Sequence, residues 1–376
     1  MHDEPLVRIR LQGSSLPASA AWAEGLEVKL PYSMAALLGG DSTVWKDETV
    51  RSHARKAAVR LRERNAYLSR PPASGRLPIS YRSVPSSLRQ IIGRGIGRLY
   101  RYRQAHWADF PGWPLDLSAD VAKDLGTVSF EKTDRTPVIL SHDIDSSEGL
   151  DNLIKWFLPI EEALGARSAN YIVPFAWPID RALTSEVRAR GHEIGIHGYD
   201  HSNRTPFASH AERTERIVAG ARVAAEFGAV GYRAPSLVRS RALIRDLAGR
   251  YRYDSSIPTS GGLFPVPNNG CASARPWKID GMWELPLSLP RDGSLRFLGH
   301  DPAQILEMWM NSANLIANSR GLVCLLTHCE RSFSGNPPML KCYRAFIERI
   351  ASDNRFEFVR PVDLTARLDE RSANVR

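Results

Sequence analysis

The segment Glu193-Ile194-Gly195-Ile196-His197-Gly198-Tyr199-Asp200-His201 joins a short apolar run to two histidines. The apolar run predicts a buried strand that delivers its end to His197. Histidines spaced four residues apart lie on one face of a helical turn, where two imidazoles can bind one divalent ion. The alternative is a pair of structural histidines without a ligand role. The segment therefore predicts a strand-end metal site, provided that further ligands lie nearby.

A second apolar run supplies such ligands. Residues 136–141 are followed by His142-Asp143-Ile144-Asp145, which places two carboxylates at the end of another expected strand. Residues i and i+2 of a strand face the same side, so both acids can reach one site. One acid would complete a two-histidine, one-carboxylate metal site, and the other would be available for proton transfer. The sequence leaves open which acid takes which role.

The chain alternates between expected strands and helices from residue 136 onward, which is typical of parallel βα units. Strands are expected at 138–141, 169–173, 193–197, 230–233, 252–254, 282–287, 322–327 and 356–359. Helices are expected at 149–164, 182–190, 209–227, 239–249, 302–319 and 338–352. With 376 residues, the chain is longer than one average domain. We expect an accessory region over 1–132, basic and partly rich in Pro and Ser, and a catalytic domain over 133–376.

Positive charge is concentrated between Arg51 and Arg103, where the only acid is Glu63, and the net charge of the chain is +9. This composition predicts an anionic partner such as a glycolipid phosphate or a membrane surface, with a solvated basic face as the alternative. No nucleic acid is expected as a partner. Within this segment, residues 93–98 read Gly-Arg-Gly-Ile-Gly-Arg without the preceding strand of a dinucleotide loop, and we expect a turn or a helix end there.

The spacing of the cysteines and the hydropathy of the chain indicate the cellular compartment. The four cysteines have no spacing typical of a zinc ribbon or a redox motif, and the first residues lack the pattern of a secretory signal. No apolar run has the length of a membrane span. We therefore expect a cytoplasmic protein with reduced thiols, in contact with the inner face of the membrane at most peripherally.

Further polar residues end the other expected strands. They are Arg233 after Gly231-Tyr232, Asp254 after Tyr253, Glu284 after Trp283, and His328 after Thr327. The carboxyl ends of parallel strands meet at one edge of a sheet or barrel, so these side chains are expected to share a site with the histidine pair.

The content and order of these motifs resemble the polysaccharide deacetylases of carbohydrate esterase family four, in a His-Asp-x-Asp variant, over residues 136–368. The resemblance implies an α/β fold, a distorted (β/α) barrel, with the N-terminal region as an accessory. The roles that it implies are Asp143 as catalytic base, Asp145, His197 and His201 as metal ligands, Arg233 as the residue that orients the base, His328 as catalytic acid, and Asp254 as the residue that tunes that acid.

The sequence departs from the family pattern in three places. Ile144 separates two acids that are usually adjacent, so the labels of base and metal ligand stay interchangeable between Asp143 and Asp145. Gly198 stands where Ser or Thr is common. The basic region ahead of the barrel has no counterpart in the family pattern.

These observations predict a metal-dependent hydrolase that cleaves a linear amide. The expected substrate is an N-acetylated or N-formylated amino sugar of a surface polysaccharide or a lipid-linked glycan. The expected cofactor is a divalent metal, zinc first, with cobalt, iron or manganese as alternatives. Two other functions stay open: an amidohydrolase of the same fold that acts on a non-sugar amide or imide, and a catalytically decayed basic protein that binds carbohydrate.

Overall fold

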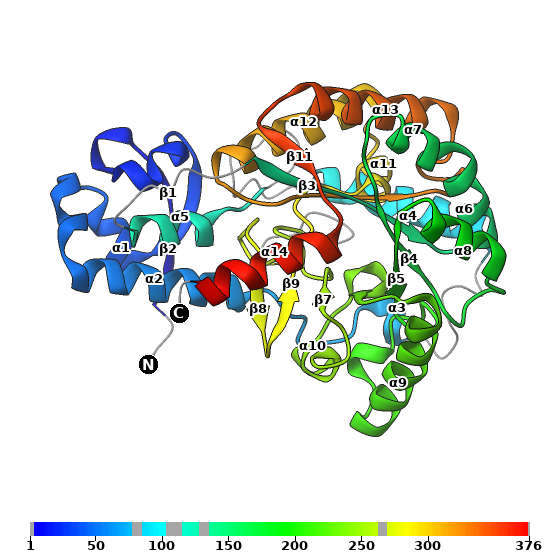
Figure 1. Ribbon diagram of the computed structural model, residues 1–376. Coiled ribbons are helices and arrows are strands. Elements are labelled where there is room, and N and C mark those ends of the chain that lie inside the picture. Colours follow the sequence, from blue (N-terminus) through cyan, green and yellow to red (C-terminus); the bar gives the residue numbers. More distant parts are fainter. Residues whose placement is uncertain (1–3, 77–84, 103–114, 128–134, 262–268, 375–376) are drawn as a thin grey trace.

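The chain from Thr136 onward forms a mostly parallel β-sheet (Figure 1). The structure, a computed structural model, describes residues 4–76, 85–102, 115–127, 135–261 and 269–374. Within this part of the chain the strand order is β10-β3-β4-β5-β6-β7-β9-β8, and β11 pairs with β3. The strands are β3 (Thr136–Ile144), β4 (Ala169–Ile172), β5 (Glu193–His197), β6 (Gly231–Arg233), β7 (Tyr253–Asp254), β8 (Trp277–Ile279), β9 (Met282–Glu284), β10 (Val323–His328) and β11 (Phe356–Phe358).

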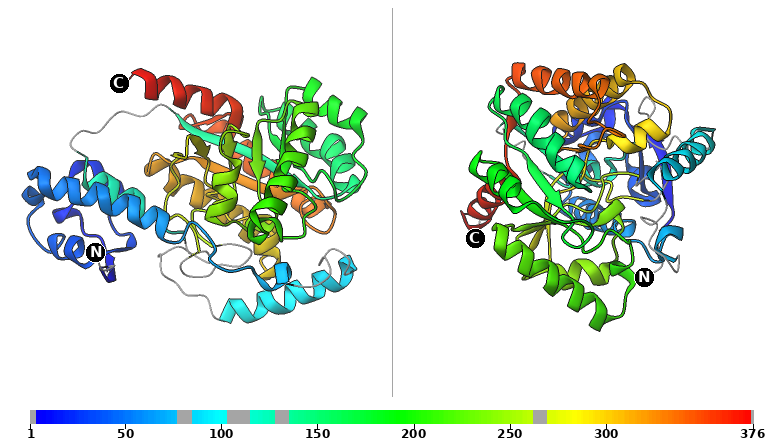
Figure 2. Two further views of the ribbon diagram at one scale, coloured as in Figure 1. Left: turned by 90° about the horizontal axis from the view of Figure 1, so that it is seen from below. Right: turned by 90° about the vertical axis from the view of Figure 1, so that its right-hand side faces the viewer.

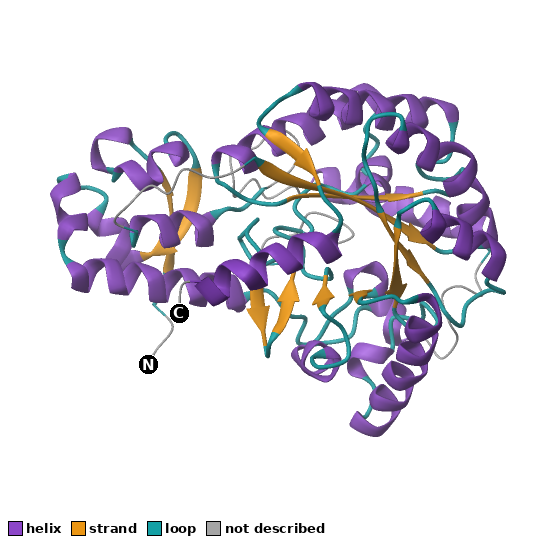
Figure 3. Ribbon diagram, viewed as in Figure 1, coloured by secondary structure: helices purple, strands orange, loops and turns teal. Residues whose placement is uncertain are grey.

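The sheet curls into a half-barrel (Figure 3). Its pairs are parallel from β10 through β9, and among the described strands of this sheet only β8 runs antiparallel to its neighbour. The strands β8 and β10 stand at the two ends of the order, so no pair between them closes the barrel. The predicted distorted (β/α) barrel is therefore confirmed. The edge strand β8 was not predicted, because three residues are too few to show a hydropathic period.

Helices surround the outer face of the sheet (Figure 1). They are α6 (Ser147–Asn152), a π-helical turn (Leu153–Phe157), α7 (Leu158–Glu162), α8 (Arg181–Ala189), α9 (His210–Phe227), α10 (Arg241–Leu247), α11 (Asp292–Phe297), α12 (Pro302–Asn318) and α13 (Pro337–Ser352). Helix α14 (Pro361–Asn374) instead packs against the inner face, through Leu364. The helices expected from periodicity are all present. The short helix α11 was not expected, and it proves important for the site.

The two faces of the sheet bury different sets of side chains. Val138, Leu140 and Ile144 of β3 belong to the larger core, which includes residues of the surrounding helices. Ile139 of β3 and Tyr171 of β4 belong to a second core on the inner face. This alternation follows from the two-residue period of a strand, and it decides which strand-end side chains reach the inside of the half-barrel.

The N-terminal region has a small core of its own. The antiparallel strands β1 (Leu6–Arg10) and β2 (Glu27–Pro31) pack with α1 (Tyr32–Leu37), α2 (Glu48–Arg64) and α5 (Ser118–Leu125). Two largely buried ion pairs connect α5 to the barrel, because Asp124 accepts hydrogen bonds from Arg275 and from Arg320. The boundary at residue 132 remains a prediction.

The helices α3 (Ala73–Arg76) and α4 (Ser86–Tyr102) follow α2 along the chain. Helix α4 lies at the periphery of the molecule in both views of Figure 2 and packs on α11. The expectation of a turn or helix end at residues 93–98 was wrong, because this run forms the middle of α4. In the part of the chain that the structure describes, no helix has the length and hydropathy needed to cross a membrane.

Candidate metal and catalytic site

Three side chains that were expected to bind metal converge inside the half-barrel. Asp145, His197 and His201 each offer one ligand atom, and these atoms lie within 4.8 Å of one another. Oδ1 of Asp145 lies 3.4 Å from Nε2 of His201 and 3.7 Å from Nε2 of His197. Both imidazoles are buried, whereas Asp145 keeps partial contact with solvent. The arrangement matches a two-histidine, one-carboxylate site with an open side.

The two histidines reach the site from a sharp turn and not from a helical turn, so that part of the prediction was wrong. His197 is the last residue of β5. Gly198 and His201 then adopt left-handed backbone conformations, with φ of 69° and 60°. The ring centroids of the two histidines are 5.1 Å apart. The loop therefore brings both rings together without a helical turn.

Hydrogen bonding fixes the tautomer of His197. Its Nδ1 lies 3.1 Å from the carbonyl oxygen of Arg233, and a carbonyl oxygen only accepts, so Nδ1 carries the proton. The lone pair of Nε2 then faces the carboxylates of Asp143 and Asp145. This nitrogen is buried and makes no hydrogen bond to a described residue. A buried imidazole nitrogen of this kind, facing carboxylates, fits the ligand set of a divalent cation.

A buried arginine holds the second acid. Nη1 of Arg233 donates to Oδ1 of Asp143 at 3.1 Å and to Ser141 at 2.9 Å. Nε of Arg233 donates to the carbonyl oxygen of Ser255, and its guanidinium lies 4.1 Å from the ring centroid of Tyr171. The other oxygen of Asp143 lies 3.4 Å from Nε2 of His197. Arg233 therefore pairs with Asp143 and orients its carboxylate beside the metal-binding residues.

His328 also lies at this edge, but its carboxylate partner differs from the expected one. Nδ1 of His328 lies 2.8 Å from Oδ1 of Asp292, the first residue of α11. The backbone N–H of His328 and the hydroxyl of Ser334 donate to Oδ2 of the same carboxylate. Burial lowers the pKa of His328, but the carboxylates of Asp292, first, and of Asp143 and Asp145 together raise it to about 9. The expectation that Asp254 supports His328 was wrong.

The strand register explains why Asp254 cannot reach His328. Asp254 pairs in register with Tyr232, which belongs to the core on the helix side of the sheet, whereas the adjacent Arg233 points to the inside. Oδ1 of Asp254 instead accepts a hydrogen bond from Ser256, and its pKa is raised by burial. Glu284 is next to Asp254 in register, and its pKa is raised by burial and by that neighbouring carboxylate. Asp254 therefore belongs to a buried acid pair outside the site.

Glu330 is a further acid at the site that the sequence analysis did not identify. Its Oε1 accepts hydrogen bonds from the backbone N–H of Asp145 and from the hydroxyl of Ser146. Burial, and then the charge of Asp145, raise the pKa of Glu330 to about 7. Glu330 follows His328 by only two residues. Its closeness to a strand end that already carried a candidate catalytic group is the feature of the sequence that could have identified it.

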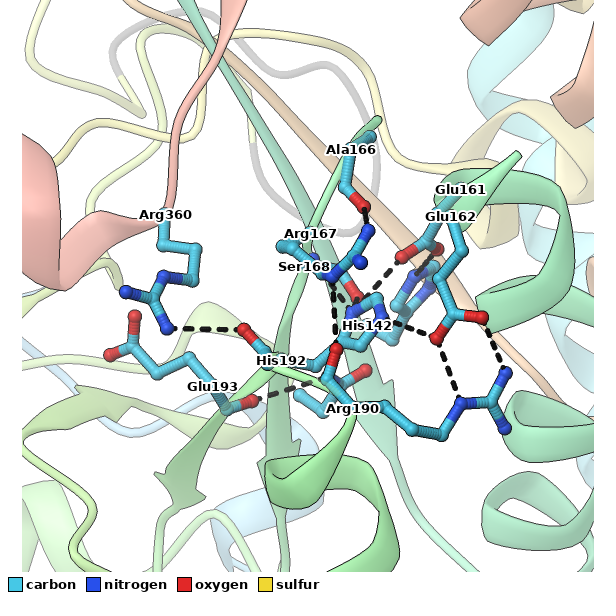
Figure 4. Close-up of polar contacts among 12 residues, drawn as sticks. His142, Glu161, Glu162, Ala166, Arg167, Ser168, Arg190, His192, Glu193 and Arg360 are labelled. Carbon is cyan, nitrogen blue, oxygen red and sulfur yellow. Dashed lines mark hydrogen bonds and ion pairs between the residues drawn. The ribbon is translucent and has the colours of Figure 1, made fainter. Parts of the chain in front are cut away.

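A buried polar network lies behind the site on the helix side of the sheet (Figure 4). Oε1 of Glu161 lies 2.8 Å from Nε2 of His142 and accepts a hydrogen bond from Tyr343 at 2.8 Å. Nδ1 of His142 lies 2.8 Å from the hydroxyl of Thr327. His142 precedes Asp143 and Thr327 precedes His328, so the network ties the two strands that carry the acid and the histidine.

A pocket of about 380 Å3 opens between α6 and α8, and none of the candidate metal-binding or catalytic residues lies on its wall. Ser147, two residues after Asp145, lies on its wall together with Trp177. The other lining residues are Leu150, Asp151, Pro178, Ile179, Asp180 and Leu183. The pocket wall combines an aromatic ring, aliphatic side chains and carboxylates.

Comparison with known proteins supports the fold. No protein-family model matches the chain, and no curated protein matches it. A crystal structure described as a polysaccharide deacetylase from Mycobacterium smegmatis matches 65% of this chain and 94% of its own, with 18% identity and a TM-score of 0.51. Another, from Pseudomonas aeruginosa, matches 62% and 90% at 14% identity and a TM-score of 0.46. Peptidoglycan deacetylase from Bacillus subtilis matches 64% and 95% at 12% identity and a TM-score of 0.41.

The chain therefore has the polysaccharide deacetylase fold. At this level of identity the comparison establishes the fold alone. The case for a reaction rests on the side chains that this chain places at the carboxyl ends of its strands.

Proposed function

We propose that the protein is a metal-dependent hydrolase that removes an acetyl or formyl group from the nitrogen of an amino sugar, in a surface polysaccharide or a lipid-linked glycan. One observation carries the proposal. The metal-ligand triad lies beside a carboxylate held by Arg233, and the same strand edge carries a histidine held by a carboxylate. A metal-dependent amide hydrolase uses these three elements: an ion, a base and an acid.

Asp145, His197 and His201 are the residues that would hold the ion. A divalent ion in such a site polarises the amide carbonyl and lowers the pKa of a bound water, and zinc is the first candidate by ligand type. His197 is preset for this role because the carbonyl of Arg233 holds its Nδ1 proton. Asp145 is held in place through its backbone N–H, which donates to Glu330.

Asp143 is the proposed base. Its Oδ1 is held by Arg233, while its Oδ2 faces His197 and the ion-binding side chains. The ion pair with Arg233 orients the carboxylate so that its other oxygen can accept a proton from the attacking water. Because Asp143 lies on the buried side of the site, this proton does not escape directly to solvent.

His328 is the proposed acid. With a pKa raised to about 9, the imidazole is protonated at neutral pH. Its Nδ1–H is held by Asp292, which leaves Nε2–H to donate to the nitrogen of the departing amino sugar. An amide nitrogen leaves poorly without a proton, and the free amine and a carboxylate are the products.

The test is amine release from a panel of N-acetyl and N-formyl amino sugars, measured with the metal-loaded protein and with the apoprotein. The panel includes a cyclic imide and a non-sugar amide. Metal-dependent release from a sugar supports the proposal, and release from the imide or the non-sugar amide alone shows that the substrate class is wrong. Stoichiometric metal binding without release from any compound would indicate a binding protein.

A further inference from the structure

Helix α4 turns its apolar side chains outward. Leu88, Ile91, Ile92, Ile96 and Leu99 are all exposed, and Ile91 retains 66% of its accessible surface. At 100° per residue these positions form one continuous stripe along the helix. Exposed apolar residues elsewhere in the described chain lie on separate elements: Tyr32, Val59, Trp156 and Phe175. Large contiguous patches of this kind mark interaction surfaces on soluble proteins.

The opposite side of α4 is fixed against the protein by glycines. Gly93 and Gly97 lie four residues apart, on one face, and both contact α11 at Phe297. A Cβ atom at Gly97 would meet the carbonyl group of Phe297, and one at Gly93 would meet its ring. Only glycine allows this approach, so the contact sets the rotation of α4. The apolar stripe therefore points outward because the glycine face packs inward.

Positive charge borders the stripe. Arg94 and Arg98 are exposed, lie four residues apart on one side of it, and α4 contains no acidic residue. Arg296 of α11 lies close enough that Arg94 contributes, after burial, to lowering its pKa. A second copy of α4 packed on the stripe would bring these like charges together. An anionic lipid surface would instead match both the apolar stripe and the charge at its border.

We propose that α4 docks the protein onto an anionic lipid surface, with the helix axis in the plane of the interface. An interfacial helix buries one apolar face at the level of the lipid headgroups, and basic side chains beside that face attract anionic lipids. The other segment of high positive charge, α2, does not combine a stripe of exposed apolar residues with basic residues at its border. Arg51 and Arg55 of α2 pair with Glu48, and Arg62 lies over the ring of Trp277.

Docking through α4 would place the candidate site next to the lipid. Helix α11, on which α4 packs, begins at Asp292, the partner of His328. Helix α4, about 10 Å across, and the six-residue α11 therefore lie between the docking face and the candidate catalytic acid. If the proposed hydrolase function holds, this geometry favours an N-acyl amino sugar carried by a lipid over a soluble glycan.

Vesicle sedimentation with the full chain tests the docking. We expect binding to vesicles of phosphatidylcholine mixed with phosphatidylglycerol, weak binding to phosphatidylcholine alone, and a loss of binding as salt rises. The double variant Ile92→Glu/Leu99→Glu, in the middle of the stripe, should reduce binding at least tenfold. Arg94→Gln/Arg98→Gln should reduce it less and remove most of the salt dependence. The matched control is Val59→Glu, an exposed apolar residue on α2, which should bind as the wild type does.

Three results would overturn the proposal. The first is an absence of vesicle binding, or equal binding by Ile92→Glu/Leu99→Glu and the wild type. The second is a concentration-dependent dimer, seen by sedimentation velocity, that the double variant abolishes. The third is a large fall in Tm for the double variant, together with an absence of vesicle binding by the wild type. This result would show that another part of the chain covers the stripe. Amine release from a soluble N-acyl amino sugar is measured in parallel. A variant that keeps this activity but loses vesicle binding separates docking from the proposed chemistry.

Discussion

Nδ1 of His328 lies 2.8 Å from Oδ1 of Asp292, and this contact sets the protonation state of the candidate acid. Burial alone would lower the pKa of His328, yet the carboxylate of Asp292, with smaller contributions from Asp143 and Asp145, raises it from 6.5 to about 9. Because the folded pKa lies above the unfolded one, the stabilisation is fully present below about pH 6.5 and is lost as pH rises through about 9. The acid function of the imidazole fades over the same alkaline range.

Replacing Asp292 with Asn should therefore move the alkaline limb of the activity profile to lower pH. Without the carboxylate, burial is left as the main influence on His328 and lowers its pKa. The kcat-against-pH profile measures the shift, and an NMR titration of the imidazole assigns it. Asp254→Asn is the control, since Asp254 lies on the other face of the sheet. An unchanged alkaline limb in the Asp292 variant would remove His328 from the mechanism.

Asp143 and Asp145 should show different phenotypes. Asp143→Asn is expected to keep the metal and lower kcat by about two to four orders of magnitude, the range for loss of a general base. Asp145→Asn should weaken metal affinity first, because its Oδ1 faces both histidines. Elemental analysis and kcat are measured on the same samples. If the two phenotypes are reversed, the labels of base and ligand must be exchanged.

Removal of either imidazole should abolish metal binding at stoichiometric concentration. His197→Ala and His201→Ala each leave two of the three ligands, and a site with two ligands binds weakly. Isothermal titration of the apoprotein with zinc measures the loss. His210→Ala is a suitable control, because that histidine is exposed at the start of α9. Full metal occupancy in the double variant of His197 and His201 would contradict the site.

Much of the site was predictable because parallel strands end at one edge. Asp143, His197, Arg233 and His328 each end an apolar run, and the register of the sheet brings them to the same inner face. The same signal misled at Asp254, which also ends a strand but is one residue out of phase. Strand phase depends on pairing between distant segments, which a short run such as Tyr253-Asp254 cannot reveal.

Other features depended on tertiary structure alone. Asp292 begins a six-residue helix that periodicity could not identify, and its role follows only from the approach of β10. The glycines of residues 93–97 were expected to break a helix, by propensity. Gly93 and Gly97 lie inside α4 because close packing on Phe297 offsets that preference, whereas Gly95 faces open space. The same packing places the apolar stripe on the outside, which the sequence pattern could not distinguish from a buried stripe.

The buried network behind the site should matter for stability. Glu161→Leu leaves His142 and Tyr343 without their shared acceptor, and each unsatisfied buried group costs about 1–3 kcal/mol. We expect the free energy of unfolding in urea to fall by about 2–5 kcal/mol. Glu186→Leu, on α8, removes an exposed pair with Arg190 and should cost under about 1 kcal/mol. Equal effects of the two substitutions would deny the network a structural role.

The turn between the two histidines gives the last prediction. Gly198 has a φ of 69°, and a Cβ atom there would meet the ring of Pro235. Gly198→Ser introduces the residue type that is common at this position in the deacetylase pattern, but here it should displace the loop and weaken metal affinity. The left-handed conformation alone costs about 1–2 kcal/mol for a residue other than glycine. Gly249→Ser isolates that cost, because Gly249 has a φ of 79° and nothing within 4 Å of its Cβ position. Urea unfolding and zinc titration of both variants separate backbone strain from the contact with Pro235. Equal losses of stability, with unchanged zinc affinity, would mean that Pro235 does not constrain the loop that carries His201.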